Sequence, residues 1–453
     1  MSTKTQFGSK IGLVAATVGS AVGLGNVWRF PAEAQANGGA AFLLLYLGCV
    51  LILGVPVMVA EFALGRGGGS DAVGSFKNLG AGKHWWLVGG LAVIASYLIM
   101  SFYMVVAGWT LEYMWQSVTG ALYAPIEGID SLRGLFQTKM DSYVVDDLNP
   151  LIATWIVIAI NIGVLMAGVQ KGIERLSNWM MPLLFVLLMV FMCYAMTLPG
   201  AGDGLKFFFN PDFSKITTET VLKALGQTFF SLSLGMGILV TYASYYPADT
   251  KLTRTALTVS LMATLVAVMV GMIIFPGVMS FHLEGEEMQG STLVFVTLPE
   301  MFAQMPLSAM WSVMFFLLLF VAALTSTISI AEVSVAFLQE RFGMRRLPAV
   351  LTSLLPLLAV SSVCSLSQGS LSGFTVFGMT VFELFDYVAT NILLPIGSIF
   401  LCIYVGWFAP KGMFRNQITN NGTIRSRMAP VILSLVRYVA PLLIAIVLIS
   451  TFL

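Results

Sequence analysis

The sequence is poor in charge and in the residues that build catalytic or metal centres. Only 10% of its 453 residues are charged, against about 25% in an average soluble domain, and 58% are hydrophobic. A soluble fold is therefore excluded, and the net charge of +1 predicts no nucleic-acid partner. Two histidines and four cysteines, with no metal-ligand or disulfide spacing, argue against a metal centre. No Ser–His, HExxH or paired-aspartate pattern is present, so we expect no enzyme.

Long apolar runs are present instead from end to end of the chain. A helix needs roughly 20 apolar residues to cross a bilayer. We therefore predict an all-α polytopic membrane protein, a single transporter domain over residues 1–453. Its eleven helices are expected at 11–37, 39–65, 85–117, 151–168, 175–198, 219–246, 254–281, 307–338, 347–364, 379–408 and 428–452.

The basic residues of the connections predict the orientation of these helices. Connections on one side carry sixteen Lys or Arg residues, and those on the other side carry four. Basic residues collect on the cytoplasmic side of a membrane. The sequence therefore predicts a multi-pass protein of the bacterial cytoplasmic (inner) membrane, with its N-terminus inside and its C-terminus outside. The four residues expected outside are Arg133, Lys139, Lys206 and Lys215.

Two predicted helices are interrupted at mid-span by glycines and small polar residues. The first break is GSAVGLGN, residues 19–26, and the second is SLSLGMG, residues 231–237. Unwound backbone inside a bilayer is tolerated only where protein or a water-filled cavity satisfies it. Paired breaks in matching halves indicate an inverted-repeat transporter with a site near the membrane midplane. We expect five-helix repeats at 11–198 and 219–408, with an additional C-terminal helix at 428–452.

The breaks and the eighth helix carry the chemistry of binding. Free N–H groups at a half-helix N-terminus suit a carboxylate, and free carbonyl oxygens suit a bare cation. The eighth helix adds four hydroxyls between Thr325 and Ser329, which favour an oxygen-lined cation site. Charges inside a membrane are functional by default. Arg29 and Asp386 are candidates for a paired outer gate, and Glu61 is expected to satisfy unwound backbone.

These motifs resemble the neurotransmitter:sodium symporter family over essentially the whole chain. The resemblance rests on GSAVGLGNVWRFP (19–31), NGGAAF (37–42), SLSLGMG with TYASY (231–245), ALTST (323–327) and NILLP (391–395). An eleven-helix chain resembles the bacterial LeuT-like branch of that family. The resemblance implies a LeuT-type 5+5 inverted repeat with helices 1 and 6 broken. It also implies sodium-coupled symport of an amino acid by alternating access.

The resemblance assigns a role to individual residues. The amino-acid substrate would be bound by Ser20, Ala21, Leu24, Gly25, Ile99, Tyr103, Phe230, Ser233, Met236, Ser326 and Ile330. The second sodium ion would take carbonyls of Gly19, Val22 and Ala322 and hydroxyls of Thr325 and Ser326. The first would take the Ala21 carbonyl, Asn26, Ser231 and the substrate carboxylate. The gates would be Arg29 with Asp386 outside, and Lys4, Phe7, Tyr242 and Glu340 inside.

The seventh helix departs from the family pattern. The family usually places Asn or Asp where this chain has Ala263, and Ala267 stands where a carboxylate can replace chloride. Tyr46, Gln227 and Ser231 still match the chloride-site pattern. Three alternatives stay open: the first sodium site is weak or lost, chloride assists it, or water fills the gap.

The expected substrate is neutral, because burying an unpaired charge in the pocket would cost several kcal/mol. Flexible Met236 between two glycines favours a bulky hydrophobic or aromatic amino acid. The competing functions are a proton-coupled or uncoupled carrier, a channel, and a substrate sensor on the same scaffold. The lipid bilayer is the other expected partner, and no obligate protein partner is inferred.

Overall fold

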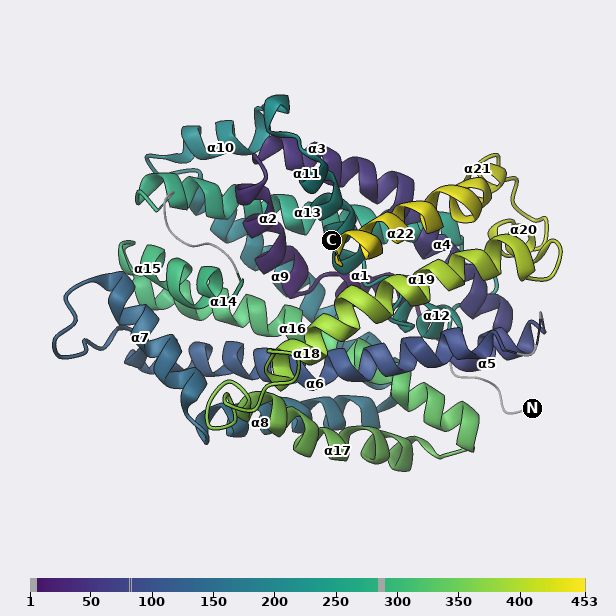
Figure 1. Cartoon of the computed structure of the whole chain (residues 1–453), viewed down its shortest axis with the longest axis horizontal. Coiled ribbons are helices and arrows are strands. Elements are labelled where there is room, and N and C mark those ends of the chain that lie inside the picture. The colour runs from purple at the N-terminus through teal and green to yellow at the C-terminus, as the bar shows by residue number, and fades with distance from the viewer. Residues whose placement is uncertain (1–5, 81, 83, 284–289, 453) are drawn as a thin grey trace.

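The computed structural model describes residues 6–80, 82, 84–283 and 290–452. The long helices run roughly side by side along one axis of an elongated bundle (Figure 1). Within the described residues every named element is helical. Lys4, one of the predicted gate residues, lies outside the described residues.

Nine helices of the described chain are long and apolar enough to cross a membrane. Several consist of two α-helices joined without a break by a π-helical turn. The nine are α3–α4 (Ala40–Gly68), α6 (Trp86–Thr119), α8 (Asn149–Met166), α9 with its preceding π-turn (Val169–Ala195), α13 (Leu252–Ser280), α16 (Ser308–Phe342), α17 (Arg346–Leu366), α18–α19 (Val381–Phe408) and α21–α22 (Ala429–Ser450).

Two further segments are broken where the sequence predicted it. Helix α1 (Lys10–Ala21) ends before the break, and a helix resumes at Gly25 through α2 (Phe30–Ala36) with a bend of 54°. Helix α11 (Thr218–Ser231) and helix α12 (Ile238–Ala243) are separated by six non-helical residues. With each broken segment counted as one span, the fold is consistent with the predicted eleven helices.

The connections contain short helices that the sequence analysis did not predict. They are α5 (Ala72–Asn78), α7 (Leu132–Val145), α10 (Ala201–Phe209), α14 (Gly290–Thr292), α15 (Leu298–Ala303) and α20 (Met413–Ile418). Helices α7, α10 and α15 lie at one end of the bundle, and α5 and α20 lie at the other (Figure 1). This grouping matches the two sides predicted from the basic residues. We call the α7 end the outer end and the α5 end the inner end.

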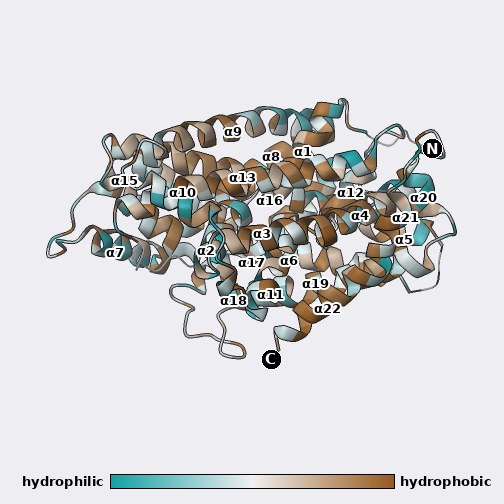
Figure 2. Ribbon diagram, turned by 90° about the horizontal axis from the view of Figure 1, so that it is seen from above, coloured by the Kyte–Doolittle hydropathy of each residue, from teal (hydrophilic) through white to brown (hydrophobic). Residues whose placement is uncertain are grey.

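The buried fraction of each span shows which helices form the core of the bundle. Helix α16 is the most buried of the nine spans and packs against α6, α9 and α17. The span α21–α22 is the least buried, and the ribbon of α22 carries mostly the colour of hydrophobic residues in Figure 2. Its Leu442 is 62% exposed, as is expected for a surface that faces lipid instead of water. The two broken segments therefore lie among buried helices, which position the site.

Candidate substrate and sodium site

The break after α1 is shaped by a close approach to two side chains. A Cβ on Gly23 would lie 2.7 Å from Ser326 Oγ and 2.9 Å from the Tyr103 hydroxyl oxygen. A larger residue would have to displace these two side chains, so glycine lets the chain leave the helix directly against α16 and α6. The N–H of Leu24, freed by the break, donates to the Tyr103 hydroxyl at 3.1 Å. Leu24, Tyr103 and Ser326, all predicted substrate residues, are thereby brought together.

The break between α11 and α12 is tied to the first break and to α4. Ser233 has a φ of 53°, and its hydroxyl donates to the Ser20 carbonyl at 2.7 Å. Gly235, at φ +78°, donates its N–H to Glu61 Oε1 at 2.8 Å. Glu61 is fully buried, so its carboxyl satisfies unwound backbone inside the membrane, as predicted. The two breaks therefore form one connected site.

The residues assigned to the second sodium ion lie together between α1 and α16. Ser326 Oγ donates to the Gly19 carbonyl at 3.5 Å, and Thr325 Oγ1 donates to the Ala322 carbonyl at 3.0 Å. A Cβ on Gly19 would lie 3.3 Å from the Thr325 side chain. Val22, fully buried, caps the end of α1. The polar atoms here are carbonyl and hydroxyl oxygens, and this set of atoms fits a hard cation such as sodium.

The residues assigned to the first sodium ion lie against α13. Asn26 Nδ2 donates to the Ala263 backbone carbonyl at 3.0 Å, so the backbone of α13 lies against Asn26 here. The Tyr46 and Ser231 hydroxyls are 2.8 Å apart and hydrogen-bonded to each other. Ala263 and Ala267 are fully buried and offer no side-chain oxygen. Ala21, also buried, is the last residue of helix α1.

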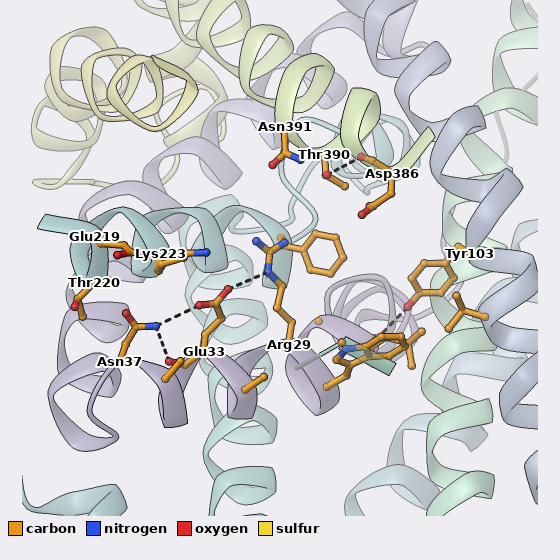
Figure 3. Close-up of a pocket in the computed structure, with 18 of the residues that line it drawn as sticks. Arg29, Glu33, Asn37, Tyr103, Glu219, Thr220, Lys223, Asp386, Thr390 and Asn391 are labelled. Carbon is orange, nitrogen blue, oxygen red and sulfur yellow. Dashed lines mark hydrogen bonds and ion pairs between the residues drawn. The ribbon is translucent and has the colours of Figure 1, made fainter. Parts of the chain in front are cut away.

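A cavity of about 790 Å³ extends from the breaks to the outer end of the bundle (Figure 3). Leu24, Gly25, Tyr103 and Phe230 line it, and so do charged side chains. The charged residues of its lining are Arg29, Glu33, Lys215, Glu219, Lys223 and Asp386. The other predicted substrate residues are buried or nearly so and lie outside this lining. They are Ser20, Ala21, Ile99, Ser233, Met236, Ser326 and Ile330.

The predicted outer gate pair is not formed in this structure. The Arg29 guanidinium lies over the Phe230 ring, 5.2 Å from its centroid, and 3.9 Å from a Glu33 carboxylate oxygen. Figure 3 shows Asp386 on the opposite wall of the cavity. The Arg29–Asp386 pair therefore remains a prediction for a closed state.

The ion pair with Glu33 keeps Arg29 on the side of the cavity away from Asp386, so removing Glu33 is expected to change substrate affinity. In Glu33→Gln the ion pair is lost, so Arg29 is expected to move toward Asp386 and favour closure. Because Arg29 is about two-fifths exposed, the gain is about 0.5 kcal/mol, or roughly two-fold in apparent substrate affinity. Equilibrium binding would measure it. Glu219→Gln, which lines the same cavity from α11, is the control, and an equal shift in both variants would contradict the assignment.

The inner end of the bundle is closed by packed aromatic side chains. The Phe7 ring packs edge-on against Tyr242, with centroids 5.8 Å apart. The Tyr242 hydroxyl donates to Ser329 at 2.8 Å, and Ser70 Oγ donates to Glu340 at 3.4 Å. Three of the four predicted inner-gate residues are therefore placed at this end.

An exposed ion pair joins the start of α1 to the loop after α12. Lys10 Nζ lies 2.8 Å from an Asp249 carboxylate oxygen, and this hydrogen bond lowers the pKa of Asp249. Both side chains are exposed, so water screens the pair and its contribution to stability is small.

Two charged residues of the predicted spans, Glu332 and Arg437, have partners that the sequence did not indicate. Glu332 on α16 is fully buried and meets Arg346, the first residue of α17, at 2.6 Å. The Tyr245 hydroxyl also donates to Glu332, at 2.8 Å. Arg437 donates to the Gly406 carbonyl at 2.6 Å and lies over the Trp407 ring. The signal in the sequence that could have predicted this pair was an acidic residue in α16 followed by a basic residue at the start of α17.

Two broken helices meeting at a buried site beneath an open cavity define a multi-pass membrane transporter. Residues 4–125 and 143–453 match the model of the sodium:neurotransmitter symporter family. The chain therefore belongs to the sodium:neurotransmitter symporter family, as its motifs indicated, and is a sodium-dependent transporter, not an enzyme.

Similar proteins cover the chain almost completely. An uncharacterized sodium-dependent transporter, YhdH of Bacillus subtilis, is 36% identical over 98% of this chain and 96% of its own length. An uncharacterized sodium-dependent transporter of Haemophilus influenzae is 32% identical over 98% of this chain and 97% of its own length. The crystal structure of MhsT in complex with L-phenylalanine matches with a TM-score of 0.88 and 38% identity, covering 99% of this chain and 100% of that one. The LeuT-type fold follows from this match.

Proposed function

We propose that this protein is a sodium-coupled symporter that carries a neutral, bulky hydrophobic or aromatic amino acid into the bacterial cell by alternating access. The observation that supports it most directly is the convergence of both breaks with the α16 hydroxyls. In this reading the inner end lies in the cytoplasm, and the cavity opens to the outside with the C-terminus on that side.

The free backbone groups of the breaks suit the two charged ends of an amino acid. The carboxylate would accept from the N–H groups of Leu24 and Gly25 and from the Tyr103 hydroxyl. The Tyr103 hydroxyl accepts a hydrogen bond from the Leu24 N–H, so these two groups already lie together. The ammonium group would lie against the carbonyls of Ala21, Phe230 and Ser233. A helix N-terminus and a set of carbonyls are the complementary partners for these charges.

The surroundings of the substrate side chain favour a large apolar group. Met236 is held between Gly235 and Gly237, which have φ of +78° and +74°. Its unbranched side chain can move to admit a bulky ring. Ile99 and Ile330 are buried and apolar, whereas the charges line only the outer cavity. The structural match to a transporter crystallised with L-phenylalanine supports this class of substrate.

Sodium would couple to conformation through the contact between α1 and α16. Gly19 and Ser326 belong to different helices and are joined by a long hydrogen bond of 3.5 Å. An ion shared by both helices would hold them together and stabilise the substrate site next to it. Each ligand would then raise the affinity of the other, because coupling between two sites is reciprocal.

Uptake by proteoliposomes tests the proposal. Labelled phenylalanine, tryptophan and leucine are offered with an inward sodium gradient or with potassium in its place. We expect concentrative uptake only with sodium. In Thr325→Ala/Ser326→Ala the sodium concentration for half-maximal uptake is expected to rise at least about ten-fold, since each lost charge-assisted contact is worth about 1.5 kcal/mol or more.

Thr327→Ala is the matched control, because its hydroxyl donates to the Leu324 carbonyl within α16. It should leave the sodium dependence unchanged. Equal uptake in potassium would contradict sodium coupling, and uptake driven by a pH gradient alone would identify a proton-coupled carrier. Binding without any flux would identify a sensor.

A further inference from the structure

Arg437 is a charged residue inside the last membrane span, α21–α22, near the inner end of the bundle. It lies roughly two turns, or about 12 Å, from the start of that span at Ala429. Helices α19 and α22 lie side by side in Figure 1, and each of their spans contains a π-helical turn at the contact. These turns are Tyr404–Phe408 and Leu435–Val439, and the second contains Arg437. Arg437 is therefore level with the last turn of α18–α19.

One N–H group of the Arg437 side chain has a structural role. Its Nε donates to the Gly406 carbonyl at 2.6 Å. In a regular helix this carbonyl would accept from the residue four positions later, but that residue is Pro410, which has no N–H. Arg437 therefore satisfies a carbonyl that the end of the span leaves free. A neutral donor would satisfy it equally well, so this hydrogen bond does not explain the positive charge.

The rest of the guanidinium group meets an aromatic ring but no anion. Its Cζ lies 4.9 Å from the centroid of the Trp407 ring. The two Nη atoms of Arg437 have no hydrogen-bond acceptor among the described residues, and no carboxylate in that part of the chain forms an ion pair with it. A permanent charge inside a membrane span is costly and functional by default. Both Nη atoms are thus left for an anion that the described residues do not supply.

The side chains around Arg437 indicate that this anion is the headgroup of a lipid. Trp407 and Tyr438 are each 55% exposed, and their rings are perpendicular with centroids 5.3 Å apart. Phe408 is 52% exposed and contacts the ring of Trp85, which precedes α6, at 4.9 Å between centroids. Tryptophan and tyrosine collect at the headgroup level of a membrane. The row of exposed rings therefore places Arg437 on the lipid-facing surface, at the depth of the phosphates.

We propose that Arg437 and Trp407 form a binding site for the phosphate of an anionic phospholipid in the leaflet at the inner end. A guanidinium binds phosphate through two parallel N–H bonds, and the Nη atoms offer such a pair. The Gly406 carbonyl and the Trp407 ring orient the group before the lipid binds. Basic pockets between membrane helices are known to take anionic headgroups.

The site selects the headgroup by its charge. A phosphatidylglycerol headgroup carries only the phosphate charge, whereas choline brings a second positive charge next to Arg437. No carboxylate of the described residues pairs with Arg437, so none is placed beside it to receive that second charge. Phosphatidylglycerol is therefore favoured over phosphatidylcholine. Because the site lies on the lipid-facing surface, its test is independent of sodium symport.

Native mass spectrometry of the purified transporter, titrated with dioleoylphosphatidylglycerol or dioleoylphosphatidylcholine, tests the site. The first phosphatidylglycerol is expected to bind at least about ten-fold more tightly than the first phosphatidylcholine, because charge-assisted hydrogen bonds are the strong ones. Arg437→Gln keeps a donor for the Gly406 carbonyl without the charge, so the preference should disappear. Arg437→Lys keeps the charge without the planar fork and should retain part of the preference.

Arg427→Gln is the matched control, since Arg427 is an exposed cation in the connection just before α21. It should keep the wild-type preference. Thermal unfolding gives a second readout, because a ligand that binds only the folded protein raises its Tm. Phosphatidylglycerol is expected to raise the Tm of the wild-type protein and of Arg427→Gln, but not that of Arg437→Gln.

Three results would overturn the proposal. Equal affinity of the wild-type protein for both lipids would do so, and this comparison holds even if Arg437→Gln does not fold. An equal loss of preference in Arg437→Gln and Arg427→Gln would show a diffuse attraction to basic residues instead of a site. Displacement of the bound lipid by inorganic phosphate at millimolar concentration would identify a site for free phosphate and contradict the assignment to a lipid.

Discussion

Replacing Arg346 by alanine is expected to shift this transporter strongly away from the conformation with a closed inner end. Glu332 is fully buried and pairs with Arg346 through both carboxylate oxygens, at 2.8 and 2.6 Å. Removing one partner of a buried ion pair leaves an uncompensated charge and costs about 3–5 kcal/mol. Any conformation that admits water to Glu332 is relieved of this cost, so opening at the inner end is favoured about a hundred-fold or more.

A conformational equilibrium measurement checks this expectation. Cysteine introduced at Phe7 should become reactive toward a water-soluble thiol reagent in Arg346→Ala, and apparent substrate affinity should fall. In Glu332→Gln/Arg346→Ala the uncompensated carboxylate is absent. The reactivity of the cysteine and the apparent substrate affinity should therefore return toward wild type. Arg437→Ala is a control, because Arg437 contacts a carbonyl and an indole ring instead of a carboxylate. If the single and double variants behave alike, loss of packing and not of charge compensation explains the effect.

The second large effect is expected from Gly23→Ala in the α1 break. The new methyl group would lie 2.7 Å from Ser326 Oγ and 2.9 Å from the Tyr103 hydroxyl oxygen, closer than real contacts allow. It would displace a predicted sodium ligand and a predicted carboxylate ligand together. We expect substrate affinity to fall about a hundred-fold, since two contacts of about 1.5 kcal/mol each would be lost.

The matched controls are Gly48→Ala in α3 and Gly90→Ala in α6. A Cβ at either position would meet no atom within 4 Å, so these variants test the loss of glycine without a clash. Alanine there should be neutral or stabilising by up to about 1 kcal/mol. Scintillation-based binding of labelled phenylalanine to purified protein measures the substrate affinity of all three variants. Wild-type affinity in a folded Gly23→Ala protein would show that the close approach is not needed for binding.

The membrane spans were predictable because their signal is local. A run of apolar residues long enough for the bilayer stands out in composition alone, and only helices satisfy their own backbone there. The loop helices, such as α7 and α10, were missed because they are short and less apolar. Helix α9 begins at Arg175, as predicted, and the π-helical turn Val169–Glu174 that precedes it was not predicted.

The chemistry of the site was only partly predictable. The glycines of both breaks and the hydroxyls at Thr325 and Ser326 pointed to the site by residue type. Glu61 was expected to satisfy unwound backbone, and its bond to Gly235 confirms that. The Glu332–Arg346 pair was missed because the two charges belong to different helices, so their contact depends on how α16 and α17 pack.

The sequence by itself determined which segments cross the membrane, where two helices break and which family the chain belongs to. These properties follow from runs and motifs of neighbouring residues. Only the tertiary structure decided that Arg29 is held by Glu33 and Phe230, with Asp386 on the opposite wall of an open cavity. It also placed the side-chain oxygens of Asn26 and Gln227 where they have no hydrogen-bond partner among the described residues. Such contacts join residues far apart in the chain, so they depend on how the helices pack.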